Sequence, residues 1–325
     1  MKFEPISYEH AARLIAERPW DVSRSAESLA SAHRKALEVY GSDACVVGLD
    51  LYNVEVEAYG CGIVEPEGNG VPTAGEPLFE EIDDLLSLRL DPSKDGRLPM
   101  VLEAAAALAR TNPDVEIRVP LSGPFTIACH LLGMENMICE LFSDPEPAEA
   151  ALLHLAENQS IYADAARERG FPVSIFESSV TPPLLSPRLF SERVLPSLRK
   201  IIGKFGSPDA TATQLIIGGD TAPIAGAMRS SGAGYVICPV ETDQKEFLAL
   251  VGPESGIHVR VNMNPAVFLP GNLEAARDEA DRVLRIARGR EKTSIGSLLP
   301  FDADPGIVQK VSRFIESERP AGPRT

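Results

Sequence analysis

The sequence has few basic residues, and this limits the kinds of partner that the protein can bind. Its 325 residues include 31 Lys and Arg against 47 Asp and Glu, which gives a formal net charge of −16. Nucleic-acid binding depends on clustered Lys and Arg that neutralise phosphates, so we expect no nucleic-acid partner. Polyanionic small substrates are disfavoured on the same ground, unless a local basic pocket overrides the average.

Long apolar runs and a leader-type start are lacking too. No run approaches the roughly 20 apolar residues of a membrane helix. The first residues, MKFEPISYEHAARLIAERPW, show no basic segment followed by an apolar one, which is the pattern of a secretory signal. We therefore expect a cytoplasmic protein with no membrane partner.

Cysteine and histidine, the usual ligands of zinc, are few and scattered. The five cysteines form no CxxC pair, and the five histidines show no HxH, HxxxH or HExxH spacing. A disulfide framework is not expected in a cytoplasmic chain of this length, where buried thiols behave as small apolar side chains. The sequence therefore contains no local zinc motif.

What the sequence does contain is an alternation of short apolar runs with amphipathic segments. Most of the runs are continuously apolar, which is typical of strands covered on both faces. We expect strands at 44–50, 115–120, 173–176, 213–217, 235–238, 257–262 and 292–296. Helices are expected at about 7–41 and then at 99–110, 146–169, 190–205, 222–231 and 272–288.

This alternation predicts an α/β fold with a parallel sheet and right-handed crossovers. The number of units favours a (β/α)8 TIM barrel with extra N-terminal helices, formed by residues 1–325 as a single domain. No GxGxxG follows the first expected strand, which disfavours dinucleotide binding. In such a barrel, the chemistry takes place where the strands end at the C-terminal face.

Three acids follow expected strands directly: Asp50 after CVVGL, Glu177 after VSIF, and Asp220 after the TQLIIGG stretch. A carboxylate at a buried strand end suits proton transfer or substrate anchoring. We therefore predict these three residues as catalytic and expect them to converge on one pocket. Helix capping by Asp220 and a polar loop start at Glu177 are the alternatives.

The segment after the first strand, DLYNVEVEAYG, adds further polar candidates. If it is extended, Asn53, Glu55 and Glu57 share one face. Asn53 and Glu57 are predicted to bind substrate, and a solvated charged edge is the alternative for the two glutamates.

The remaining candidates for substrate binding also lie at strand ends. Ser122 and Phe125 precede an expected helix whose N-terminus suits a polar ligand, although Ser122 could merely satisfy backbone N–H groups. His130, within that helix, is expected to be a packed structural residue. Glycines allow close approach to the backbone. The rest of the predicted set is Ser179, Gly218, Gly219, Asn262 and Ser297.

Five segments in order resemble the uroporphyrinogen decarboxylase superfamily, and more closely its methyltransferase branch, which includes methylcobalamin:coenzyme M methyltransferases. The segments are LDLYNVEVEAYGCGI, SGPFTIACHLLGMENMICELFSDPE, LLSPRLFSERVLPSLRKI, GAGYVICPVETDQKEF and VNMNPAVFL. The resemblance covers most of the chain and itself implies a barrel.

The same resemblance implies a zinc enzyme, with His-x-Cys after one strand and a second Cys in the last loop. Those three places fall here at Ile216, Gly218 and Ser297, none of which offers a thiolate or an imidazole. Zinc is therefore not expected at the usual site, and no metal-ligating residue is predicted. The arginine-containing loop of the decarboxylases is missing as well, because Arg13, Arg18, Arg24 and Arg34 are widely spaced.

The resemblance implies a corrinoid-linked methyltransferase, which moves a methyl group between a small substrate and a corrinoid carried by a partner protein. The small-molecule methyl donor or acceptor is not identified by the sequence, and a homodimer is left open. Two alternatives remain: a carboxy-lyase acting on another acid, and a barrel that binds a ligand without catalysis. Release of CO2 without corrinoid would mark the first, and binding without turnover would mark the second.

Overall fold

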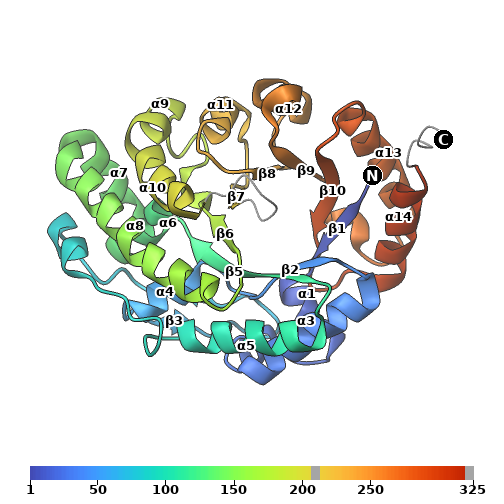
Figure 1. Cartoon of the computed structure of the whole chain (residues 1–325), viewed down its shortest axis with the longest axis horizontal. Helices are drawn as coiled ribbons and strands as arrows, with labels where there is room; N and C mark the ends of the chain where they lie inside the picture. The colour runs from blue at the N-terminus through green and yellow to red at the C-terminus, as the bar shows by residue number, and fades with distance from the viewer. Residues whose placement is uncertain (206–212, 319–325) are drawn as a thin grey trace.

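The computed structural model describes residues 1–205 and 213–318, in which eight parallel strands form a nearly closed barrel surrounded by helices (Figure 1). The strand order is β1-β10-β9-β8-β7-β6-β5-β2, and no pairing joins β1 to β2 within these residues. The predicted (β/α)8 barrel is confirmed. Its strands are β1 (Phe3–Ile6), β2 (Ala44–Val46), β5 (Glu116–Ser122), β6 (Val173–Phe176), β7 (Gln214–Ile216), β8 (Tyr235–Cys238), β9 (His258–Asn262) and β10 (Thr293–Leu298).

Strand β1 lies in a segment for which the sequence pattern predicts no strand. It pairs in parallel with β10, with Phe3 opposite Ile295 and Ile6 opposite Leu298. A strand of four residues that contains Pro5 gives a weak signal, and Pro is tolerated there because β1 is an edge strand. At the start of the barrel, the ammonium group of Lys2 pairs with Asp43, which lies just before β2, so this contact links the two edges.

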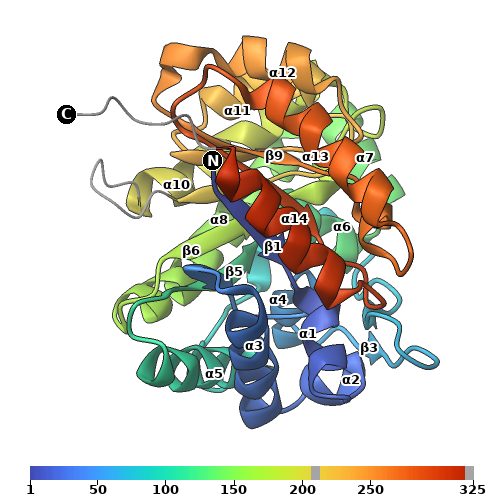
Figure 2. The ribbon, with the colours of Figure 1, turned by 90° about the vertical axis from the view of Figure 1, so that its right-hand side faces the viewer.

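The N-terminal region is helical as predicted, and the structure divides it into three helices. Helix α3 (Ala26–Tyr40) starts at Ser25, whose Oγ accepts a hydrogen bond from the Ser28 amide at 3.2 Å. It ends at Gly41, where φ is 66°, a conformation that glycine adopts without steric cost. Two shorter helices, α1 (Tyr8–Leu14) and α2 (Pro19–Val22), precede it, and α3 packs against α1 and α5 below the barrel (Figure 2).

The segment after β2 is helical, so the expected extended conformation is wrong. Helix α4 (Asn53–Ala58) places residues four apart on one side. Asn53 and Glu57 therefore lie toward the same side of the helix, whereas Glu55 turns toward Ser122. A short antiparallel pair, β3 (Ile63–Val64) and β4 (Thr73–Ala74), follows it.

The other helices lie outside the strands, and the predicted ranges 99–110, 146–169 and 272–288 are helical to within a few residues. The other two predicted ranges differ from a plain α-helix. Residues 190–205 contain a π-helical turn (Phe190–Val194) before α10, and residues 222–231 begin with a 3₁₀ turn (Ala222–Ile224). The helices are α5 (Leu98–Thr111), α6 (Pro124–Leu132), α7 (Met134–Ser143), α8 (Pro145–Arg167), α9 (Pro187–Leu189), α10 (Leu195–Phe205), α11 (Ala225–Arg229), α12 (Gln244–Val251), α13 (Leu273–Ala287) and α14 (Pro305–Ser317).

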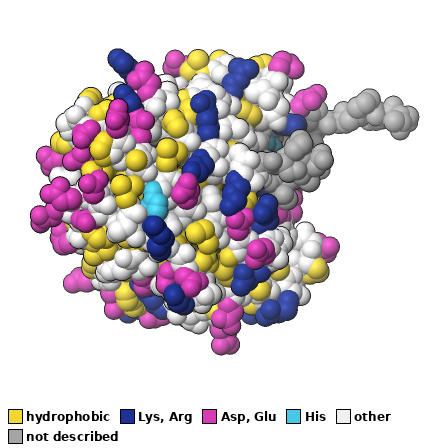
Figure 3. Space-filling model, turned by 60° about the vertical axis from the view of Figure 1, so that its left-hand side comes forward, with side chains coloured by type: hydrophobic (Ala, Val, Ile, Leu, Met, Phe, Trp, Pro, Cys, Tyr) yellow, Lys and Arg dark blue, Asp and Glu magenta, His cyan; other side chains and the backbone are white. Residues whose placement is uncertain are grey.

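The main apolar core lies between the strands and the surrounding helices, and a smaller cluster lies inside the barrel. The inner cluster consists of Leu51, Phe176, Ile216, Tyr235 and Ile237. The face drawn in Figure 3 carries Lys and Arg side chains interspersed with Asp and Glu. Over residues 1–205 and 213–318, no single helix is long and apolar enough to cross a bilayer, although α6 and α7 together meet that measure across a bend of 112°.

We predict that Leu121→Ala lowers the free energy of unfolding by about 2–5 kcal/mol, since Leu121 of β5 is completely buried and the truncation leaves a cavity. The matched control is Leu250→Ala in α12, where the side chain is 44% exposed and the loss should stay below about 1 kcal/mol. Urea unfolding followed by far-UV circular dichroism measures both losses. Equal losses would contradict the placement of β5 in the core.

Candidate functional site

A cavity of about 540 Å³ opens at the C-terminal ends of the strands. Its size is in the range of sites for small molecules. Its walls are largely apolar, and they close around a few polar groups. The apolar lining residues include Ile6, Leu49, Leu51, Val71, Phe176, Ile216, Ile237, Val240, Met263 and Leu298.

Three aromatic rings meet on one side of this cavity. Phe176, the last residue of β6, contacts the rings of Tyr8 and Tyr52 edge-on, with centroid separations of 6.3 and 6.0 Å. The Tyr52 hydroxyl is hydrogen-bonded to Ser178. The phenol of Tyr8 makes no hydrogen bond among the described residues, and burial raises its pKa. The rings thus form a rigid apolar wall with one free hydroxyl.

Asp50 lies in the cavity lining and is held by Arg97, which precedes α5. Asp50 Oδ1 accepts a hydrogen bond from Arg97 Nη1 at 2.9 Å, and Oδ2 accepts one from Nη2 at 2.7 Å. Arg97 also donates from Nε to Glu57, and Glu57 in turn pairs with Arg24 at 2.6 Å. The two-point contact fixes the orientation of the Asp50 carboxylate.

Asn53 connects Asp50 to the segment that borders the cavity on another side. Its side-chain nitrogen donates to the Pro72 carbonyl at 2.6 Å and lies 3.4 Å from Asp50 Oδ2. Pro72 and its neighbours Val71 and Thr73 line the cavity next to β4. The contact therefore holds this segment against the end of β2.

Glu177 is completely buried, with its carboxylate at the N-terminus of α6 rather than in the cavity lining. Oε1 accepts hydrogen bonds from the Thr126 amide at 2.7 Å and from the Thr126 hydroxyl, and Oε2 accepts one from the Phe125 amide at 3.1 Å. Burial raises the pKa of Glu177 to about 7, although these hydrogen bonds oppose the shift. Gly123 is required beside it, because a Cβ there would lie 2.1 Å from Glu177 Oε2.

Glu55 makes a similar contact one strand away. Its carboxylate accepts hydrogen bonds from the Ser122 amide at 2.6 Å and from the Ser122 hydroxyl at 3.0 Å, and burial raises its pKa to about 7. The side chain of Gln159 in α8 donates to the Ser122 carbonyl. These contacts fix the end of β5, and the Ser122 hydroxyl donates to Glu55 and to the Leu51 carbonyl rather than satisfying free backbone N–H groups, which was the alternative for that residue.

The three acids predicted as catalytic do not converge on one pocket, so that expectation is wrong. Asp50 lines the cavity, whereas Glu177 is enclosed beneath α6. Asp220 is exposed and accepts a hydrogen bond from the Thr242 hydroxyl at 2.8 Å, outside the cavity lining. The chain turns into helix after β6 and β7, and the two carboxylates follow those turns rather than the strand direction. Their catalytic roles stay predictions.

Of the residues predicted to bind substrate, Asn53, Gly218 and Asn262 line the cavity. Gly219 lies outside the lining and adopts a φ of 79°, and a Cβ there would clash with Thr181 at 2.5 Å, so the turn requires glycine at this position. The Ser297 hydroxyl donates to the carbonyls of Met263 and Leu298. The remaining members lie outside the lining: Glu57, Ser122, Phe125 and Ser179.

The lining residues outside the predicted set include one imidazole and one guanidinium. His130 of α6 lines the cavity, makes no hydrogen bond among the described residues, and has a pKa lowered by burial. The expected structural packing is partial, because the ring is half-buried at the cavity wall. In the sequence, His130 follows Thr126 by four residues, and this spacing places both side chains on the same face of the helix. That spacing was the sequence feature that could have marked His130 as a candidate. Arg260 lies within β9, and a charged residue inside the apolar run IHVRVN was the corresponding signal.

The three places where the resemblance implies zinc ligands do not fit that metal. Ile216 presents an aliphatic side chain to the cavity, Gly218 presents only backbone, and the Ser297 hydroxyl is directed to carbonyls. Zinc prefers sulfur and imidazole nitrogen, followed by carboxylates. Across residues 1–205 and 213–318, no group of three His, Cys, Asp or Glu has the arrangement of a metal site.

Comparison with known proteins shows that the sequence matches one protein family and is similar to several methyltransferases. A model of the uroporphyrinogen decarboxylase (URO-D) family matches residues 6–314. The chain is 27% identical over 197 residues to the methylated-thiol–coenzyme M methyltransferase of Methanosarcina mazei. It is 26% identical over 227 residues to the methylcobamide:CoM methyltransferase MtaA of Methanosarcina barkeri. These matches cover 60% and 69% of this chain, and they span 52% and 66% of the two relatives.

A solved methyltransferase structure from Methanosarcina mazei has the same fold. The TM-score is 0.81 at 22% sequence identity, and the superposition covers 97% of this chain and 92% of that chain. The likeness extends to the whole described barrel.

We predict that the stability of the protein falls, relative to a Glu177→Gln variant, as the pH rises from about 4.5 to 7. The folded-state pKa of Glu177 is raised from 4.5 to about 7. The unfolded chain therefore releases this proton first, and the folded state becomes less favoured across that window. The relative loss should approach about 3 kcal/mol and level off above pH 8. Urea unfolding of both proteins at pH 5, 6, 7 and 8 measures it, and parallel pH profiles would contradict it.

We also predict that the variant Ile216→His/Gly218→Cys/Ser297→Cys gains about one zinc per chain, because it restores the ligand types that zinc prefers. A Cβ at Gly218 meets no atom within 4 Å, and Cys replaces Ser297 with little change in shape. Elemental analysis of both proteins, purified without chelator, measures the metal. Equal zinc in the unmodified chain would contradict the assignment, and Ser297→Cys alone is the control for adventitious binding.

Proposed function

Because the chain belongs to the uroporphyrinogen decarboxylase family, we propose that it is a methyltransferase that moves a methyl group between a small substrate and a corrinoid carried by a separate protein. The observation that carries this proposal is the apolar cavity at the C-terminal mouth of the barrel, which is the place where barrel enzymes do their chemistry. The names of the curated relatives, a methylated-thiol and a methylcobamide methyltransferase, support the reaction type.

An apolar mouth suits methyl transfer between a bound molecule and a second protein. In this reaction the carbon–cobalt bond of the corrinoid breaks while a bond to the acceptor forms, and the electron pair stays on cobalt. Water would compete with the acceptor and solvate it, so its exclusion favours the transfer. The aromatic wall of Tyr8, Tyr52 and Phe176 excludes water from one side, and docking of the partner covers the open side.

The cavity residues are assigned positioning and binding roles. Asn53 and Asn262 offer amide groups to the substrate, and Gly218 allows it to approach the backbone. Asp50, held by Arg97, positions Asn53 and the segment around Pro72. Glu177 positions the start of α6, the helix that carries His130.

His130 is the proton carrier of this reaction. Burial lowers the pKa of its imidazole, so the ring is neutral at pH 7 and accepts a proton readily. A thiol or hydroxyl acceptor loses a proton when it takes the methyl group, and the imidazole receives it. In the reverse direction, the protonated imidazole returns the proton to the departing group.

The test uses methylcob(III)alamin as the methyl donor and coenzyme M as the acceptor under anaerobic conditions, with cob(I)alamin formation followed by absorbance. Coenzyme M is chosen because the relatives carry it in their names. The reverse assay supplies cob(I)alamin with candidate methylated substrates. CO2 release from an acid in the absence of corrinoid would favour the carboxy-lyase instead. Ligand binding with no turnover in any assay would favour a non-catalytic barrel.

We predict that His130→Ala lowers kcat by about 10²- to 10⁴-fold, the usual contribution of a general base. In the unmodified protein, the rate should fall as the pH drops below 6.5, because protonation removes the base. The variant should lose that limb of the pH profile and be partly rescued by added imidazole. His154→Ala is the control, since His154 contacts Arg89 and the Leu88 carbonyl away from the cavity. An unchanged pH profile in His130→Ala would exclude the proposed role.

A further inference from the structure

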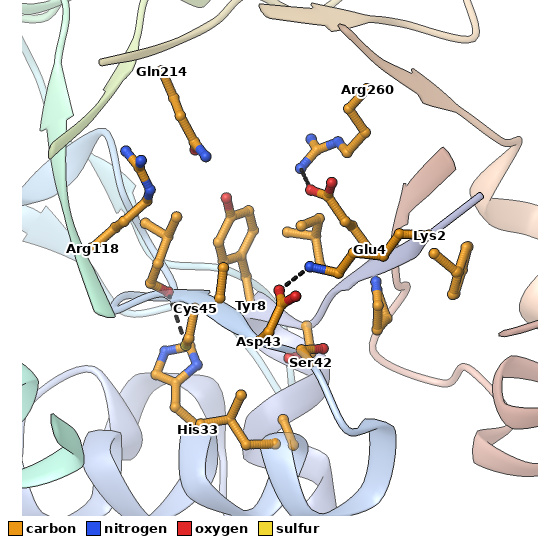
Figure 4. Close-up of a pocket in the computed structure, with 18 residues that line it drawn as sticks. Lys2, Glu4, Tyr8, His33, Ser42, Asp43, Cys45, Arg118, Gln214 and Arg260 are labelled. Carbon is orange, nitrogen blue, oxygen red and sulfur yellow. Dashed lines mark hydrogen bonds and ion pairs between the residues drawn. The ribbon is translucent and has the colours of Figure 1, made fainter. Parts of the chain in front are cut away.

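The centre of this barrel contains charged groups, whereas barrel interiors are ordinarily filled by layers of branched apolar side chains. Arg260, the third residue of β9, is only 7% exposed. Figure 4 shows that its side chain points into the same space as the Tyr8 hydroxyl and the side chains of Gln214 and Arg118. Burying an arginine is costly unless partners satisfy its charge and its donors.

The guanidinium of Arg260 is incompletely satisfied within the described residues. Nε donates to Asn262 Oδ1 at 3.0 Å, but the closest carboxylate contact is 3.9 Å, from Nη1 to Glu4 Oε2. Glu4 Oε2 itself accepts a hydrogen bond from the Tyr235 hydroxyl at 2.7 Å. Arg97 differs sharply, because its two amino groups contact Asp50 at 2.9 and 2.7 Å. Arg260 has no such two-point contact, because its amino groups lie beside the Tyr235 hydroxyl and the more distant Glu4 carboxylate (Figure 4). A planar anion in the cavity would supply the missing two-point contact.

Arg260 is also placed where a ligand can reach it. It lines the 540 Å³ cavity, whose other lining residues include no Lys and no second Arg. Three acids line the cavity: Asp50 is occupied by the two-point contact with Arg97, Glu241 is exposed, and Glu9 is half-buried. The positive end of the cavity is thus at its floor, beside the free hydroxyl of Tyr8.

We propose that Arg260 binds the carboxylate of the substrate, so that the cavity takes a small organic acid with an apolar or methylated body. Arg is suited to this role because its planar fork matches a carboxylate at two points. A carboxylate at the floor leaves the body of the acid against Leu51, Phe176 and Ile237. The far end of the acid then faces the open mouth, where a partner protein would approach.

The identification of that acid as a methyl substrate rests on the proposed function, whereas carboxylate binding by Arg260 does not. The acids that place a methyl group opposite the carboxylate include aromatic methyl ethers and quaternary ammonium acids. The ether would pack its ring against the aromatic wall, and the ammonium group would sit over the faces of those rings. Both share the anion that Arg260 recognises.

Isothermal titration calorimetry with matched probes tests the proposal without any corrinoid. The probes are 4-methoxybenzoate with its neutral counterpart 4-methoxybenzyl alcohol, and trimethylglycine with its carboxylate-free counterpart choline. We expect at least one acid to bind about 10- to 100-fold more tightly than its counterpart, as a charged hydrogen-bond pair contributes. Binding of one acid alone assigns the kind of body, and either assignment supports the carboxylate site.

The variants are Arg260→Gln, Arg260→Lys and the surface control Arg188→Gln, which removes an exposed arginine paired with Glu192. Arg260→Gln should bind the acid about 10- to 100-fold more weakly and leave the affinity for the neutral counterpart unchanged. Arg260→Lys should restore part of the affinity, and Arg188→Gln should behave as the unmodified protein does. Thermal unfolding of each variant checks that the barrel is intact.

Three results would overturn the proposal. One is equal affinity for acid and neutral counterpart, another is an equal loss for both probes in Arg260→Gln, and the third is no binding of either acid at millimolar concentration. Failure of methyl transfer with carboxylate binding intact would reject the proposed function alone. Methyl transfer to a neutral substrate that is unaffected by Arg260→Gln would reject this inference alone.

Discussion

The two-point ion pair between Asp50 and Arg97 is the contact on which the geometry of the mouth depends. It joins the end of β2 to the start of α5, and Arg97 also donates to the Ser23 carbonyl at 3.0 Å in the N-terminal segment. Through Asn53, the same carboxylate reaches the Pro72 carbonyl. Four separate segments are therefore held in place by one buried pair. Removing one partner of such a pair leaves an unpaired charge in the interior, which is far more costly than losing a surface contact.

The barrel could be predicted from the sequence because strands covered on both faces are continuously apolar, and seven of the eight strands lie at the predicted positions. Strand β1 gave no such signal, since four residues around Pro5 at a sheet edge resemble an ordinary loop. Helix α4 was missed because NVEVEA alternates as a strand would, and tertiary contacts decided its conformation. In segments of four to six residues, the sequence pattern reports only the local preference for strand or helix. The conformation of such a segment is decided by the residues it packs against.

The site was only partly predictable, for a related reason. Asp50 could be predicted because an acid directly after an apolar strand is costly to bury in the core and is therefore expected at a polar site. Glu177 has the same sequence context, yet it turns under α6 and binds two amides there. Nothing in the sequence separates an acid that faces a cavity from one that contacts the start of the helix after the neighbouring, preceding strand. His130 and Arg260 were missed although the sequence marks them. Each is a polar side chain within an otherwise apolar segment, and such a side chain is costly to bury unless it has partners or a function.

The positions that distinguish this chain from the zinc enzymes it resembles bear on how a methyl acceptor would be activated. A zinc-bound thiol is held as thiolate by the metal charge, so no separate base is needed. Ile216, Gly218 and Ser297 offer neither sulfur nor imidazole, and the polar groups of this cavity lie elsewhere, at His130 and Arg260. A neutral imidazole can remove a proton only from an acceptor of suitable pKa, and it cannot stabilise the resulting anion as a dication does. The arrangement therefore favours substrates whose charge is satisfied at a distance from the reacting atom, with the anion on the arginine and the methyl group near the mouth.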